Sequence, residues 1–159
     1  HKKEHQLHCD IKENDNVFYF TTCGWMMWNW LISVLASKAS IVLFDGSPIF
    51  KKQDLLLEIV EKEKITLFGV SAKYIDALRK FKISIKDKYK LNKLKTICST
   101  GSPLSSDGFE YIYQDVKKSG KRLCRQTRNY STSRFLGRPR LFALAPLAYF
   151  GLPAPDYLY

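Results

Sequence analysis

Hydrophobic residues in the first 118 positions follow two patterns in turn. Short runs rich in apolar and β-branched residues occur at 17–22, 40–44, 65–70 and 94–100. Each run precedes a segment in which apolar residues recur every three or four positions, at 26–38, 53–64, 71–81 and 105–118. The first pattern is typical of buried strands and the second of amphipathic helices. The sequence therefore predicts four strand–helix units in a row.

The spacing of the strands decides how they pair. The four runs begin at positions 17, 40, 65 and 94. These intervals are too long for hairpins but leave room for a helix between parallel neighbours, a connection that is almost always right-handed. We therefore expect an α/β fold, with a parallel sheet and crossover helices. Ligands of such sheets bind at the carboxyl ends of the strands, where loops and helix N-termini converge.

Four segments should line that edge of the sheet: TTCGWMM (21–27), DGSPI (45–49), GVSAK (69–73) and STGSPL (99–104). Three of them combine small residues with a hydroxyl, which favours a polar ligand. The sequence contains neither GxxxxGK[ST] nor GxGxxG. It therefore gives no support for a P-loop or for a dinucleotide-binding turn.

The loop STGSPL is the strongest binding candidate. It follows an apolar strand and precedes a helix whose first turn holds Ser105, Ser106 and Asp107. Gly101 lacks a Cβ, so a flat ring or a phosphate could approach the backbone, and Pro103 stiffens the loop. The alternative is an ordinary β-to-α turn, because Ser, Gly and Pro are common turn residues.

The stretch TTCGWMMWNW has two interpretations. A helix that is apolar on nearly all sides is buried on nearly all sides, which accounts for Trp28 and Trp30. Trp25, Met26 and Met27 instead lie at the strand-to-helix junction, where methionine could form an adaptable pocket wall. In the neighbouring segment GVSAKY, Ser71 is expected to cap a helix.

Charge divides the chain into two regions. The formal net charge is +11, but up to residue 120 lysines are interleaved with acids, as on an ordinary solvated surface. Residues 121–159 differ abruptly, with one Lys and six Arg against a single acid and with four of the six prolines. We expect a folded part at 1–120 and an irregular or disordered tail at 121–159. The Arg-rich tail leaves open a basic nucleic-acid-binding protein.

Cysteines, metal ligands and membrane segments add little. Four cysteines lie far apart without a CxxC pair, which fits reduced thiols in the cytosol. The spacing of His5, His8 and Cys9 matches no recognised zinc pattern. The longest apolar run, 25–36, is shorter than the roughly 20 residues of a membrane-spanning helix. We expect no metal site, no membrane association and a cytoplasmic location.

Four motifs together resemble one family. TTCGWMMWNW, DGSP, FGVSAKYIDAL and LKTICSTGSPLS occur in order and with similar spacing in the acetoacetyl-CoA synthetases, members of the adenylate-forming superfamily. The resemblance covers most of residues 5–118. It implies that the sheet is part of the large N-terminal domain of such an enzyme.

The resemblance also implies the chemistry. Members of the family convert acetoacetate, ATP and CoA to acetoacetyl-CoA through an acyl-adenylate, with Mg²⁺ accompanying the ATP. By similarity, Gly101, Ser102 and Pro103 match the loop along the adenine, Trp25, Met26, Met27 and Thr100 match the acyl pocket, and Ser71 is a further candidate at the neighbouring strand end. The small molecules acetoacetate, ATP and CoA are the expected partners, with no nucleic acid.

Several parts of the family pattern have no counterpart in the sequence. The Ser/Thr/Gly-rich phosphate loop, the Gly-Gly-Thr-Asp motif, the magnesium-binding glutamate and the domain with the catalytic lysine are missing. We therefore assign no catalytic or metal-binding residue and expect a piece of the ligase that is inactive alone. A truncated, non-catalytic product is the other alternative.

Overall fold

The computed structural model describes residues 1–116 and 124–126. Its strands are β1 (Asn16–Tyr19), β2 (Ser40–Val42), β3 (Leu67–Ser71), β4 (Thr96–Thr100) and β5 (Cys124–Gln126). They form one sheet in the order β2-β1-β3-β4-β5, and every neighbouring pair is parallel. The predicted α/β fold with a parallel sheet is therefore confirmed.

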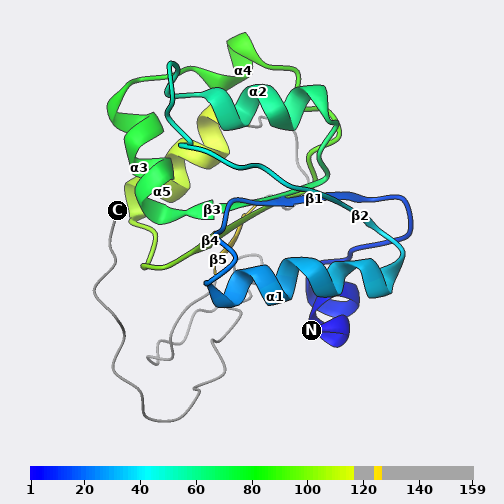
Figure 1. Ribbon diagram of the computed structural model, residues 1–159. Coiled ribbons are helices and arrows are strands. Elements are labelled where there is room, and N and C mark those ends of the chain that lie inside the picture. Colours follow the sequence, from blue (N-terminus) through cyan, green and yellow to red (C-terminus); the bar gives the residue numbers. More distant parts are fainter. Residues whose placement is uncertain (117–123, 127–159) are drawn as a thin grey trace, which may run out of the picture.

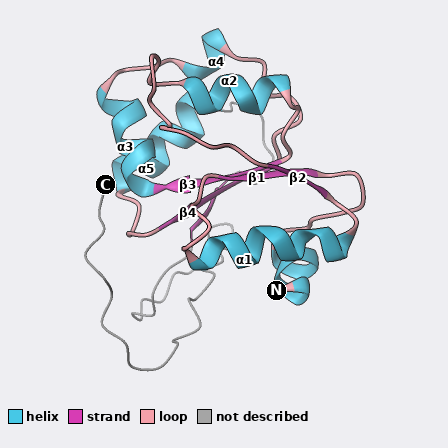
Figure 2. Cartoon of the chain, in the orientation of Figure 1, coloured by secondary structure: helices cyan, strands magenta, loops and turns pink. Residues whose placement is uncertain are grey.

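Helices cover both faces of this sheet. Figure 1 shows α1 (Met26–Ser33) and the N-terminal π-helical turn (Glu4–His8) below it, and α2 (Leu55–Lys62), α3 (Ala72–Lys80), α4 (Ile85–Lys88) and α5 (Ser106–Tyr111) above it. A 3-10 turn (Val34–Ser37) prolongs α1, and a π-helical turn (Ile112–Val116) prolongs α5. The strands in Figure 2 thus form a middle layer between two helical layers.

Side chains alternate between two cores because successive strand residues point to opposite faces. Phe18 and Phe68 pack in the larger core under α2–α5, with ring centroids 5.7 Å apart. Val17, Tyr19 and Leu67 belong to the smaller core next to α1. Both faces of the sheet are therefore buried, which explains the continuous apolar runs of the strands.

The ends of two predicted helices differ from expectation. The helix expected at 26–38 changes to a 3-10 turn after Ser33, and Lys38 then adopts a left-handed conformation with φ of +57°. The helix expected at 105–118 becomes π-helical after Tyr111. The four-residue helix α4 was not predicted, because so short a segment cannot show a helical repeat.

Strand β5 lies within the segment that we expected to be irregular. Cys124, Arg125 and Gln126 pair in parallel with Ile97, Cys98 and Ser99 of β4. The free edge of β4 offers backbone donors and acceptors to any segment that reaches it, and composition does not reveal this opportunity. The sheet thus extends past position 120. The remainder of the predicted tail, 121–123 and 127–159, lies outside the described residues.

Candidate functional site

The strand order places a candidate site at the carboxyl ends of β1 and β3. From β1 the chain passes outward to β2 through α1 on one face, and it then returns to β3 through α2 on the other. Loops that leave neighbouring strands in opposite directions open a crevice between them. The side chains that end β1, β3 and β4 are therefore the first to consider.

Ser71 and Thr100 end β3 and β4 opposite each other in the register. Both are half-buried. The Ser71 hydroxyl accepts a hydrogen bond from the backbone N–H of Tyr74 at 3.3 Å, so it caps α3 as expected. Two hydroxyl-bearing residues thus end adjacent strands at the edge predicted from the sequence.

The loop after Thr100 presents open backbone. Gly101 has a φ of +88°, and nothing lies within 4 Å of the position that a Cβ would occupy. Ser102 and Pro103 are exposed, whereas Leu104 is buried and anchors the loop. Ser105 caps α5 by accepting a hydrogen bond from the Gly108 N–H at 3.1 Å. Glycine is required here because of its conformation, and the empty space beside it would admit a flat ring.

Tyr19 connects the three strand ends. Its hydroxyl donates to Thr100 Oγ1 at 2.9 Å. To reach β4 its ring crosses Gly69 of β3, where a Cβ would lie 2.1 Å from ring atom Cδ2. Burial raises the pKa of Tyr19, which is 3% exposed. Sequence reasoning did not select Tyr19; the signal was Gly69 inside an otherwise apolar strand, which marks a close approach.

The three residues of the predicted pocket wall differ in exposure: Trp25 and Met26 are exposed, and Met27 is buried. Trp25, the N-cap residue of α1, is 54% exposed, and Met26 is 42% exposed. Met27 is buried in the smaller core together with Tyr19 and Trp30. It therefore lies behind the open edge rather than on its surface.

The predicted core role of the tryptophans is confirmed for Trp30. Its indole is 3% exposed and packs edge-on against the Tyr19 ring, with centroids 5.7 Å apart. Trp28 is only half-buried. The segment that follows β2 contributes less to the site, because Asp45, Gly46 and Ser47 are exposed beside the edge strand of the sheet.

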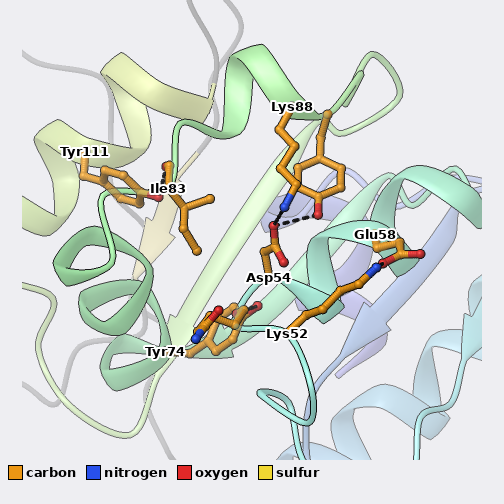
Figure 3. A network of polar contacts seen from close by, with 9 residues as sticks. Lys52, Asp54, Glu58, Tyr74, Ile83, Lys88 and Tyr111 are labelled. Atoms are coloured by element: carbon orange, nitrogen blue, oxygen red, sulfur yellow. Dashed lines mark hydrogen bonds and ion pairs between the residues drawn. The ribbon is translucent and has the colours of Figure 1, made fainter.

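A second polar cluster lies in the helical layer on the opposite face. The buried Asp54 carboxylate accepts hydrogen bonds at Oδ2 from Lys88 and, at 2.8 Å, from the Tyr89 hydroxyl (Figure 3). Burial by itself would raise the pKa of Asp54, but these two donors outweigh it and hold the pKa below its ordinary value. The cluster joins the start of α2 to the end of α4, so we assign it a structural role.

The described residues offer little for a metal ion. Within 1–116 and 124–126, no three His, Cys, Asp or Glu side chains are grouped closely enough to bind one. The residues around Gly101 suit a nucleotide ring, but this part of the chain does not supply a ligand set for the Mg²⁺ of an ATP complex. No helix in the described part is long and apolar enough to cross a bilayer.

Comparison with known proteins gives consistent results. Acetoacetyl-coenzyme A synthetase of Rhizobium meliloti (strain 1021) is 47% identical over 117 residues, and acetoacetyl-CoA synthetase of Gallus gallus is 44% identical over 119 residues. These alignments cover 74% and 75% of this chain but only 18% of either relative. No family model matches the chain.

The same name appears among solved structures. Acetoacetyl-CoA synthetase from Streptomyces lividans superposes with a TM-score of 0.75 and 37% sequence identity, over 80% of this chain and 20% of that protein. The α/β fold and the alignments thus relate the chain to one class of proteins, the acetoacetyl-CoA synthetases. The chain is homologous to one segment of these proteins and spans about a fifth of their length.

Proposed function

We propose that this chain forms part of the acyl-adenylate site of an acetoacetate–CoA ligase. In the complete reaction, acetoacetate attacks the α-phosphate of ATP, which gives acetoacetyl-AMP and releases pyrophosphate. The thiol of CoA then attacks the acyl carbon and displaces AMP. Homology to proteins named acetoacetyl-CoA synthetase supports this assignment. In the proposal, the chain contributes binding surface rather than catalytic groups.

The open backbone at Gly101 is the observation that carries this proposal. By similarity to the family, Gly101, Ser102 and Pro103 lie along the adenine, and the open backbone at Gly101 supports this role because no side chain at the turn blocks a flat ring. By the same similarity Thr100 lines the acyl pocket, and Ser71, its partner at the end of the adjacent strand, is a further candidate. The exposed Trp25 and Met26 form the apolar wall near the path of the thiol, and Met27 supports them from behind.

The remaining expectations fit this role. The nucleotide-binding part is residues 1–120, and 121–159 is the segment without a counterpart in the family. Mg²⁺ accompanies the ATP and is held by parts of the ligase outside the described residues. Among the described residues, Cys9, Cys23 and Cys98 form no disulfide, which suits a cytosolic enzyme.

Calorimetric titration of the purified chain with AMP tests the proposal. The variant Gly101→Ala places a side chain at a φ of +88° on the proposed adenine surface, and we expect it to lower AMP affinity at least tenfold. Gly46→Ala is the matched control, because Gly46 also has a positive φ, +132°, but follows the edge strand β2. Absence of AMP binding, or an equal loss in both variants, would refute the proposed site.

A further inference from the structure

A hydrogen bond joins the hydroxyl of the buried Tyr19 to the hydroxyl of the half-buried Thr100 at the proposed site. Tyr19 is buried beneath the sheet edge, and its oxygen lies 2.9 Å from Oγ1 of the half-buried Thr100. The two residues are 81 positions apart in sequence and come from β1 and β4, strands that do not pair with each other. The contact therefore exists only because the tyrosine ring spans β3.

Gly69 makes this span possible. Any Cβ at that position would lie 2.1 to 2.5 Å from three atoms of the Tyr19 ring. On its other side the ring meets the indole of Trp30, at 5.7 Å between centroids and 64° between planes. The aromatic neighbour and the glycine together hold the ring in one place, so its hydroxyl is aimed at Thr100.

The direction of the hydrogen bond determines what Thr100 can offer. Burial keeps Tyr19 protonated, so its single proton is donated to Thr100 Oγ1. A hydroxyl that accepts one hydrogen bond retains its own proton and becomes a better donor, because consecutive hydrogen bonds polarise each other. Thr100 accepts this hydrogen bond from Tyr19 and is itself only half-buried.

The surroundings of this donor are selective. Thr100 immediately precedes the open backbone of Gly101, and Tyr19 belongs to the same apolar cluster as Met27 and Trp30. A single oriented donor beside apolar side chains favours a ligand with an oxygen at one position of a short carbon chain. A ligand without that oxygen would leave the hydroxyl proton unpaired, which costs binding free energy.

We propose that Tyr19 is a positioning residue that holds Thr100 as a hydrogen-bond donor to the oxo group of a short 3-oxo acid. The pair thereby distinguishes acetoacetate from butyrate, which has the same carbon chain but lacks the oxo oxygen. This inference rests on the proposed function and extends it, because it names the atom that the site recognises and the residue that prepares it.

Competing titrations of the full chain with acetoacetate and butyrate test this inference, with methyl-labelled threonine signals as the NMR readout. We expect the wild-type chain to bind acetoacetate about tenfold more tightly than butyrate, the factor that one hydrogen bond contributes. Tyr19→Phe should reduce this preference to less than threefold and leave butyrate affinity unchanged. A merely structural role would weaken both acids equally and would contradict the proposal.

Matched variants keep the test independent of folding. Tyr111→Phe removes a hydroxyl that donates to the Ile83 carbonyl at 2.8 Å in the opposite core, and it should retain the preference. Thr100→Ser keeps a hydroxyl and should keep the preference, whereas Thr100→Val should lose it. If Tyr19→Phe does not fold, retention of the preference by Thr100→Val would still overturn the proposal.

The AMP titration separates this inference from the proposed function. If AMP binds at Gly101 while the wild-type chain shows no preference for acetoacetate, the role of Tyr19 is refuted and the nucleotide site stands. If neither AMP nor either acid binds, both are refuted.

Discussion

The imidazole ring of His5 lies edge-on to the indole of Trp30, with ring centroids 4.5 Å apart and an interplanar angle of 80°. Trp30 in turn packs against Tyr19, which reaches Thr100. A continuous series of contacts therefore joins the N-terminal segment to the carboxyl edge of the sheet. The series begins at His5, whose titratable imidazole is fully buried.

Protonation of His5 should destabilise the fold. Burial lowers the pKa of His5 from 6.5 to about 4. The unfolded chain therefore binds the proton more readily than the folded chain, and stability is lost as the pH falls from about 6.5 to about 4. This pKa shift corresponds to a loss of roughly 3 kcal/mol in the free energy of unfolding. Denaturant unfolding of wild type and His5→Phe should give free energies whose difference changes by about that amount between pH 7 and pH 4. A difference independent of pH would contradict this prediction.

Gly69→Ala should destabilise the chain by about 2 kcal/mol or more, because the new methyl group would overlap the Tyr19 ring. The double variant Gly69→Ala, Tyr19→Ala removes the overlap. Its free energy of unfolding, measured with denaturant, should exceed the value expected from adding the two single effects. Strictly additive effects would show that the ring and the glycine do not interact.

Asp54→Asn should lower the free energy of unfolding by about 1–3 kcal/mol. Lys88 and Tyr89 both donate to the Asp54 carboxylate, and the variant replaces this charged acceptor by a neutral amide. Asp45→Asn, on the exposed loop after β2, is the control and should change stability by less than about 0.5 kcal/mol. If thermal or denaturant unfolding shows the same loss of stability for both variants, the structural role assigned to this cluster is wrong.

The same carboxylate predicts an acid limb of the stability curve. Because the folded-state pKa of Asp54 lies below 3.8, its stabilising contribution is complete above that pH and is lost as the pH falls through the lower folded value. Wild type should therefore lose more stability than Asp54→Asn below pH 3.8. Parallel curves for the two proteins in this range would contradict the prediction.

The purified chain should not catalyse acetoacetate-dependent exchange of pyrophosphate into ATP. Adenylation needs positive charge at the α-phosphate, and the described residues provide no cluster able to hold a metal ion. Labelled pyrophosphate should enter ATP no faster with acetoacetate than without it. Exchange that depends on acetoacetate would show that this segment contains catalytic groups.

Local periodicity was enough to predict most of the architecture. The strands around Phe18, Phe68 and Ile97 are short apolar runs because both faces of the sheet are covered. The same pattern predicted the edge on which Ser71 and Thr100 lie in register. These features depend on residues close together in sequence, so they can be derived from one chain.

Other features depend on partners distant in sequence. The hydroxyl of Tyr19 finds Thr100 across 81 positions, which no local pattern encodes. Met27 is buried while Met26 is exposed, and a helix that is apolar on nearly all sides does not indicate which methionine faces the core. Strand β5 forms through backbone pairing with β4, a contact that composition cannot predict.

Residue-resolved NMR of the full chain during titration with a non-hydrolysable acetoacetyl-adenylate analogue tests the central claim most directly. We predict that the backbone amide signals of Ser71, Thr100, Gly101 and Ser102 shift together and saturate at one ligand concentration, while those around Asp54 stay unchanged. Saturable shifts confined to the Asp54 cluster, or no shift at the strand ends, would contradict the assignment of the site.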